Sequence, residues 1–311
     1  MAYATGTAAD YLDLLDKLRT FMLANDWESQ RYTTSGEYEF IAKGTGLEEA
    51  DEIYVGIRTF SSEAGDYYNW ELCGFTGFSS GLTFDNQPGA IASSPNRPRI
   101  SLFDDSIPYW FVGDGRRVIV VAKVSTVYQI AYLGLLNPYL PPSIMPYPLV
   151  IAGTHTGYSG ERWSVQDATH SLGVMQPNCC NTSGTESDIL ANPRSSCRFW
   201  DSQWHGIQNS YYHANASQTD WKALWPYCRY NNVRFNSVRA NINDGSYVLV
   251  PVILHMRSPV QGIFGELDGI YYITGFNQAV ENVVTIDEVD YLVVQNVYRN
   301  GIFDYCAVRL S

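Results

Sequence analysis

The sequence contains little charge, and basic residues are the scarcer kind. Only 17% of its 311 residues are charged, and 32 acidic side chains against 20 basic ones give a formal net charge of −12. An acidic surface repels the phosphate backbone of DNA and RNA, so this balance argues against nucleic-acid binding through a basic patch. The composition therefore predicts no sequence-specific nucleic-acid partner.

Long apolar runs are missing too. The longest, from Tyr247 to Leu254, contains Pro251 and falls well short of the roughly 20 residues that a membrane-spanning helix needs. Residues 1–9 contain neither the basic segment nor the apolar segment that opens a secretory signal. We therefore expect no membrane partner, and synthesis in the cytoplasm.

Familiar catalytic motifs are also lacking. No histidine pair has the spacing of a metal-binding helix, and no glycine-rich phosphate loop occurs. The segment from Gly157 to Gly160 lacks the spacing of a nucleophile elbow. Adjacent carboxylates such as Asp287 and Glu288 point to opposite sides of an extended chain, which does not suit glycoside hydrolysis. The sequence thus predicts a protein that is not an enzyme, with no catalytic, cofactor-binding or metal-binding residues.

Cysteine spacing excludes a further class of sites. Six cysteines are present without any Cys-x-x-Cys pair, so the usual zinc and redox motifs are absent. Four lie close together in the sequence: Cys179, Cys180, Cys197 and Cys228. We expect at least one disulfide among these four, with free buried thiols as the alternative. Strand-like surroundings favour free buried thiols for Cys73 and Cys306.

Aromatic residues, in contrast, are abundant, with 23 tyrosines and 8 tryptophans. Such residues favour β-sheets and protein interfaces. An approximate capping box that starts at Thr7, followed by apolar residues at spacings of three and four, predicts an N-terminal helix. Aromatic and β-branched runs at 38–43, 53–60 and 67–75 predict an antiparallel sheet against which that helix packs.

The middle of the chain alternates between loops and regular elements. Residues 76–99 are rich in Gly, Ser, Asn and Pro and predict a long surface loop. A hairpin is expected over 109–124, with its turn at Gly113 to Gly115. Small residues and helical spacing predict a second helix over 125–136, and the prolines that follow keep the next segment extended.

Residues 153–245 have weak apolar periodicity and predict a loop-rich insertion. This insertion carries five tryptophans: Trp163, Trp200, Trp204, Trp221 and Trp225. Exposed tryptophans stack on sugars, while buried ones pack or anchor interfaces, and we favour packing and interface over glycan binding. His170 and His205, near Asp167 and Asp201, leave open a metal or acid–base site.

The C-terminal segment alternates apolar and polar residues with a period of two. Asp268-Gly269 and Asn300-Gly301 suit two-residue hairpin turns, and Asp287-Glu288 is a third such connection without glycine. We therefore expect several β-hairpins in this part of the chain.

Together these patterns predict an α+β, mainly β fold. Its expected parts are a helix-plus-sheet domain at 1–152, the loop-rich insertion at 153–245, and a β-hairpin region at 246–311 that completes the β domain. The prediction places the N-terminal helix on the first antiparallel sheet.

Seven segments, spread along the chain, resemble one family of proteins in the same order. They are Glu52 to Arg58, Asp66 to Leu72, Tyr109 to Arg117, Val121 to Thr126, Ala131 to Gly134, Pro146 to Leu149 and Gly265 to Leu310. These segments resemble a family of virion structural proteins from tailed bacteriophages. Residues 155–245 match that family poorly.

The resemblance implies a structural component of a phage tail, baseplate or neck, located in the virion and made in the cytoplasm of the bacterial host. Its expected partners are other virion structural proteins and further copies of itself in a symmetric homo-oligomer. One alternative is a tail-borne glycan- or receptor-binding module that uses the tryptophan-rich insertion. Another is a particle-borne hydrolase of the cell envelope, for which the sequence shows no polar constellation.

Overall fold

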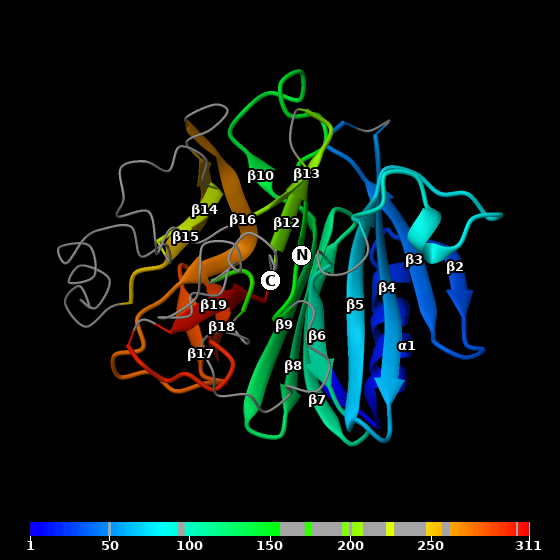
Figure 1. Cartoon of the computed structure of the whole chain (residues 1–311). Coiled ribbons are helices and arrows are strands. Elements are labelled where there is room, and N and C mark those ends of the chain that lie inside the picture. Colours follow the sequence, from blue (N-terminus) through cyan, green and yellow to red (C-terminus); the bar gives the residue numbers. More distant parts are fainter. Residues whose placement is uncertain are drawn as a thin grey trace, which may run out of the picture.

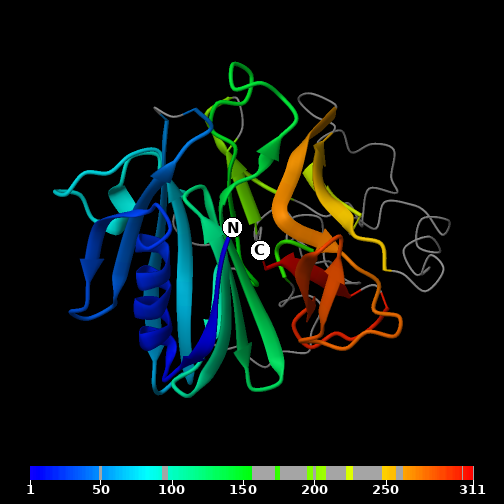
Figure 2. The ribbon, with the colours of Figure 1, turned by 180° about the vertical axis from the view of Figure 1, so that it is seen from behind.

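The structure is a computed structural model. It describes residues 1–48, 51–92, 97–155, 172–175, 195–198, 201–207, 222–226, 247–256, 262–302 and 304–310. In this part of the chain, strands form three antiparallel sheets, and the one α-helix is α1 (Tyr11–Leu23). The sheets are arranged as layers, and α1 lies beside them near the N-terminal strands (Figures 1 and 2).

The three sheets are named A, B and C. Sheet A has the order β1 (Ala2–Ala8), β7 (Ile107–Asp114), β8 (Arg117–Val124), β9 (Val127–Leu135), β11 (Leu149–Ala152), β12 (Ser195–Arg198) and β13 (Trp204–Gly206). Sheet B has the order β2 (Glu28–Thr33), β3 (Glu39–Thr45), β4 (Glu52–Ser62), β5 (Tyr67–Phe75) and β6 (Arg99–Leu102).

Sheet C is built mainly from the C-terminal segment. Its order is β14 (Lys222–Trp225), β15 (Val250–Met256), β16 (Gly262–Tyr272), β19 (Tyr305–Arg309), β18 (Val289–Gln295) and β17 (Val283–Ile286). The short β10 (Asn137–Pro138) also pairs with β16. A 3-10 turn, η1 (Phe84–Asn86), lies between β5 and β6. The predicted insertion thus contributes β12 and β13 to sheet A and β14 to sheet C.

The predicted α+β class is wrong, because the fold is essentially all-β. The single described helix spans 13 residues, and the second predicted helix is the strand β9. Every residue of β9 is buried. A strand covered on both faces loses the alternation of apolar and polar residues, so its sequence cannot be told from that of a buried helix.

Sheet A is the middle layer. Towards sheet B, the Oε1 atom of Gln129 in β9 accepts a hydrogen bond from the backbone N–H of Ser101 in β6 at 3.3 Å. Towards sheet C, the hydroxyl of the neighbouring Tyr128 donates to Glu281 Oε1, just before β17, at 2.5 Å. Neighbouring residues of one strand point to opposite faces, so β9 contacts a different layer on each side.

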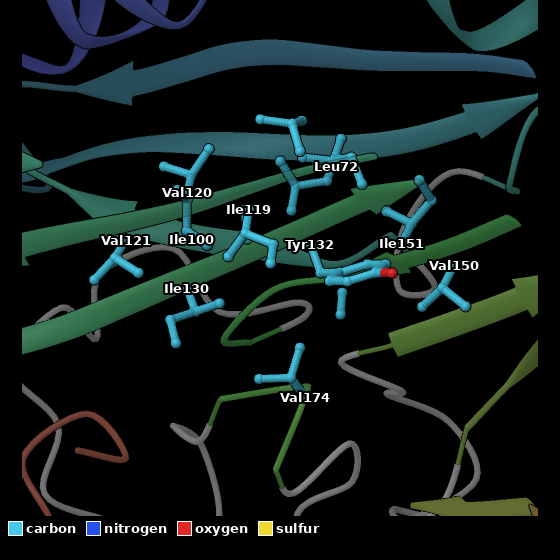
Figure 3. Close-up of a cluster of buried hydrophobic side chains, with 14 of the residues drawn as sticks. Leu72, Ile100, Ile119, Val120, Val121, Ile130, Tyr132, Val150, Ile151 and Val174 are labelled. Carbon is cyan, nitrogen blue, oxygen red and sulfur yellow. The ribbon is translucent and has the colours of Figure 1, made fainter. Parts of the chain in front are cut away.

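The apolar core is continuous across these layers. Figure 3 shows Leu72 and Ile100 of sheet B on one side of sheet A, and Val174 on the other. Ile119 and Ile130 of sheet A lie between them, and all five side chains are almost fully buried. Burial on both faces accounts for the nearly unbroken apolar sequence of β8 and β9.

The helix α1 begins one turn later than predicted. Thr7 belongs to β1, and the cap is Asp10, whose Oδ1 accepts from the backbone N–H groups of Leu12 and Asp13 at 2.8 and 2.7 Å. The Asp13 carboxylate accepts from the N–H of Ala9 at 2.7 Å, which completes a reciprocal cap. The predicted cap at Thr7 is therefore wrong, since that residue is paired with β7.

The three turns predicted in the C-terminal segment all lie among the described residues. Asn300-Gly301 falls in the longer connection from Gln295 of β18 to Tyr305 of β19, so the predicted two-residue turn is wrong there. Asp268-Gly269 lies inside β16, where Gly269 has a φ of 82°, so the predicted turn is wrong there. Asp287-Glu288 does connect β17 and β18, and both residues have positive φ, at 50° and 64°. This backbone is that of a type I′ turn, the form that suits the twist of a hairpin.

Gly134 of β9 lies opposite Arg117 of β8 and provides a test of the pairing of these two strands. Its φ is 150°, and a Cβ atom there would lie 2.3 Å from the Cα of Arg117. We expect Gly134→Ala to lower the free energy of unfolding by about 3 kcal/mol in urea titrations, through strain and displacement of β8. The control is Gly81→Ala, because a Cβ atom at Gly81 would have no atom within 4 Å apart from its chain neighbours. Equal stability of the two variants would contradict this description of sheet A.

Candidate functional site

A proline-rich loop at one end of the molecule, residues 137–148, is called here the apex loop. It runs from β10 to the start of β11 and lies at the top in both ribbon views (Figures 1 and 2). Five of its residues are proline: Pro138, Pro141, Pro142, Pro146 and Pro148. Because proline fixes φ, the backbone of this loop has little conformational freedom to lose in any association.

One end of the apex loop is attached to sheet C. The backbone N–H of Tyr139 donates to the carbonyl of Phe264 at 2.9 Å, and its hydroxyl donates to Glu266 Oε2 at 2.8 Å. Burial and the hydrogen bond to Glu266 raise the pKa of Tyr139 to about 12. The phenol therefore stays a neutral donor throughout the physiological range.

The other end is attached to sheet B. The hydroxyl of Tyr147 donates to the carbonyl of Phe75 at 2.6 Å and accepts from the backbone N–H of Tyr54 at 3.1 Å. Burial raises the pKa of Tyr147 well above its usual value. The Arg198 guanidinium lies 5.1 Å from the centre of the Tyr147 ring, and Met145 is fully buried. The apex loop is thus held by both outer sheets.

Large apolar side chains are exposed on this anchored loop and beside it. Tyr139 is 49% exposed and Ile144 is 50% exposed. Ile263, at the start of β16 and next to Phe264, is 56% exposed. We call Tyr139, Ile144 and Ile263 the apex patch. Rigid backbone that presents exposed apolar groups is suited to a protein interface.

Trp204 of β13 lies near the apex loop but is engaged within the molecule. Its indole Nε1 donates to the carbonyl of Gly89 at 2.7 Å. Its ring packs on β5, where a Cβ atom at Gly74 would lie 2.4 Å from the ring. This tryptophan therefore connects the edge of sheet A to sheet B.

Trp204 has no other tryptophan of the predicted interface set beside it among the described residues. Trp225 is half-buried at the end of β14 in sheet C. Three of the predicted residues lie outside the described residues: Trp163, Trp200 and Trp221. The structure therefore brings no two of the predicted tryptophans together within its described part.

His205 and Asp201, which the sequence offered as an alternative polar site, do form a pair. The His205 Nε2 and Asp201 Oδ2 atoms lie 2.7 Å apart at the surface. Burial alone would raise the pKa of Asp201, but hydrogen bonds from the Gln203 N–H and from His205 hold it below its usual range. His170 and Asp167 lie outside the described residues.

The predicted cysteine cluster is only partly described. Cys197 is a free, buried thiol in β12, and burial raises its pKa well above the usual value. The other three, Cys179, Cys180 and Cys228, lie outside the described residues, so a disulfide among them is still a prediction.

The free buried thiols predicted for Cys73 and Cys306 are confirmed, and burial raises the pKa of each to about 12.

A buried charge cluster on sheet B was not predicted. The Glu71 carboxylate accepts hydrogen bonds from Arg58 at 2.8 Å, Arg97 at 2.9 Å and Arg99 at 3.0 Å. Asp85, at η1, accepts from Arg58 and Arg97 at 2.9 and 2.5 Å. The Arg97 side chain is fully buried. The only sequence signal was a glutamate between Trp70 and Leu72 in a strand-like run.

This cluster fastens the connection between β5 and β6 onto sheet B. Burial alone would raise the pKa of Glu71, but the hydrogen bonds and charges of the three arginines hold it below its usual range. The same balance lowers the pKa of Asp85. The Phe84 ring lies 4.9 Å from the Arg58 guanidinium carbon and 5.5 Å from that of Arg97. The cluster is therefore a structural anchor.

A serine–histidine pair lies between sheets A and B. The Ser101 Oγ and His155 Nε2 atoms are 2.9 Å apart, and both residues are buried. The backbone of His155 is paired with that of Arg99. The hydroxyl has no exposed face from which to attack a substrate, so this contact satisfies polar groups within the core.

Among the described residues, no group of three or more His, Cys, Asp or Glu side chains is placed to hold a metal ion. The described helices include none long and apolar enough to cross a membrane. No protein-family model matches the chain, and no curated protein matches it either.

The Glu71 cluster predicts a specific acid sensitivity. Because the pKa of Glu71 is lowered in the folded chain, its stabilisation is present above the unfolded pKa of about 4.3 and disappears as the pH falls through the folded value. We expect Glu71→Gln to cost about 3–5 kcal/mol at neutral pH, since it leaves buried arginine charge uncompensated. Its stability should also fall less steeply on acidification.

Urea titrations from neutral to acidic pH measure both effects. Glu63→Gln, at an exposed position, is the matched control and should leave stability nearly unchanged. A Glu71→Gln variant as stable as the control at neutral pH would refute the anchoring role.

The attachment of the apex loop by Tyr147 is tested with Tyr147→Phe. The substitution removes one hydroxyl that serves two backbone groups, so we expect a loss of about 1–3 kcal/mol in unfolding free energy. Amide hydrogen exchange in residues 137–148 should become faster. The exposed Tyr3→Phe is the control, and unchanged exchange in the apex loop would show that Tyr147 does not hold it.

Proposed function

We propose that the chain is a structural component of a tailed-phage virion, in the tail, baseplate or neck. It acts through protein–protein interfaces and assembles with other virion proteins and with its own copies into a symmetric oligomer. The virion assignment is supported by the sequence resemblance, and the interface role by the apex patch.

The apex patch is the single observation that carries the interface role. Tyr139, Ile144 and Ile263 expose large apolar surfaces whose burial at an interface is favourable at about 25 cal/mol per Å². The loop is attached to sheet C through Tyr139 and to sheet B through Tyr147. A preorganised surface keeps more of that gain, because little chain entropy is lost on binding.

The glycan-binding alternative relied on exposed tryptophans in the insertion. Trp204 uses its indole N–H and ring face on Gly89 and Gly74 within the molecule. A sugar would have to compete with these contacts. This residue therefore supports packing, and the assembly role is the proposal we carry forward.

Incorporation into particles tests this proposal. We expect immunogold labelling to place the wild-type chain at one fixed position on the tail or neck. Ile263→Asp, alone or with Ile144→Asp, should reduce the amount incorporated at least tenfold, because it places charge in an apolar interface. Leu82→Asp changes a 41% exposed leucine away from the apex loop and should incorporate normally.

Two results would count against the proposal in different ways. Particles that carry no label with a validated antibody would overturn the virion assignment. Labelled particles with normal incorporation of Ile263→Asp would retain that assignment and eliminate the apex patch as the interface.

A further inference from the structure

Open sheets expose unpaired backbone groups along their edge strands. Proteins protect such edges with short strands, charged residues, proline, bulges or a covering segment. In the described part, the strand orders of the three sheets end in six edge strands: β1 and β13 in sheet A, β2 and β6 in sheet B, and β14 and β17 in sheet C. Comparing their protection identifies an edge that is suited to pairing.

Five of these edges are protected. The strand β13 has three residues, and β6, β14 and β17 have four each. The backbone of Arg99 in β6 is also bridged by His155. The strand β2 has six residues, but it carries Glu28 and Arg31 and has a register shift between Ser29 and Arg31. Each edge is thus too short or too irregular for extended pairing.

The described edge of β1 lacks four of these protections: it is neither short nor bulged, and it has neither charge nor proline. Its seven residues, AYATGTA, contain no charge and no proline. They pair with β7 in seven consecutive steps without a register shift. Tyr3, Thr5 and Thr7 are exposed, and among the described strands β1 pairs with β7 alone. A long, regular and uncharged edge of this kind is a template for a further strand.

We propose that β1 pairs antiparallel with β1 of a second copy, which joins two A sheets into one continuous sheet. The two-fold axis passes through Thr5, so Tyr3 of one copy lies opposite Thr7 of the other, and Ala4 lies opposite Gly6. This inference rests on the proposed assembly function and names one of its self-contacts.

The absence of charge on β1, together with its length, makes a second copy the fitting occupant. Each chain has a net charge of −12, so two copies repel each other unless they meet through an uncharged surface. β1 offers such a surface, and no charged residues fall opposite each other in this register. Two-fold pairing is self-complementary, and another β1 is the only described edge of equal length.

The side chains also suit this register. Tyr3 opposite Thr7 is an aromatic and β-branched pair, which stabilises neighbouring strands. Each Thr5 hydroxyl donates to the carbonyl of Tyr109 in its own chain at 2.8 Å, so Thr5 opposite Thr5 is a pair of β-branched side chains at the axis. On the other face, a Cβ atom at Gly6 would lie 2.8 Å from the hydroxyl of Tyr109. The absence of a side chain at Gly6 gives that ring room beside the paired edge.

Site-directed disulfide formation tests the proposal. In the proposed pair, the two Thr5 Cα atoms lie about 4.5–5.5 Å apart, within disulfide range. The two Tyr3 Cα atoms are offset by four residues, or about 14 Å along the strand, which is out of range. We therefore expect Thr5→Cys to form a covalent dimer on mild oxidation of the intact protein, and Tyr3→Cys to remain monomeric on non-reducing gels.

Solution mass provides an independent readout. The wild-type chain should show a concentration-dependent mass of twice 35.0 kDa in light scattering. Thr5→Lys should weaken this association at least tenfold, because it places two like charges at the axis. Ser29→Lys, on the protected edge of sheet B, should associate like the wild type.

The outcomes separate this inference from the proposed function. A wild-type chain that stays at 35.0 kDa, or cross-linking equal for Thr5→Cys and Tyr3→Cys, would overturn β1 pairing. Gold-labelled particles would retain the assembly proposal in either case. Unlabelled particles together with selective Thr5→Cys cross-linking would retain the pairing and overturn the virion assignment.

Discussion

Burial of β8 and β9 on both faces is the constraint on which the rest of the structure depends. Sheet B packs on one face of these strands, and sheet C with residues 172–175 packs on the other. The layers are also joined at their margins by polar contacts. Glu281 accepts from Lys123 and Tyr128 at 2.5 Å, and Arg117 of β8 pairs with Asp268 of β16. Because the middle of the molecule is filled by its own side chains, the ends and edges remain as surfaces for the proposed contacts, and the apex patch and β1 lie there.

The individual strands could largely be predicted, whereas their assembly into layers could not. Strands with one polar face, such as β4, follow the period of two, and the runs at 53–60 and 67–75 correspond to β4 and β5. β9 could not be recognised, because its apolar residues serve two layers at once. The prediction of a turn at Asp268-Gly269 was wrong for a related reason. Gly269 provides close packing near Arg117 and Ile119 within a continuing strand, although the dipeptide itself favours a turn.

The candidate site was less predictable than the fold. Prolines in residues 137–148 indicated an extended segment, but its attachment to two sheets depends on Phe75, Tyr54 and Phe264, which are distant in sequence. Glu71 can be buried because three arginines from different segments pair with it, and the sequence does not show that they meet. Trp204 was identified from its residue type, whereas its role in joining sheets A and B depends on glycines at positions 74 and 89. Charge and aromatic content indicated interfaces without locating them.

Native-state hydrogen exchange tests the central claim most directly, because it reports the stability of each strand within the folded chain. If β8 and β9 form the doubly covered core, their amides at 117–124 and 127–135 should exchange only through global unfolding and be the slowest in the molecule. The outer strands β2 and β17 should exchange through smaller local openings. Faster exchange in β8 and β9 than in β4 or β18 would contradict the layered arrangement around sheet A.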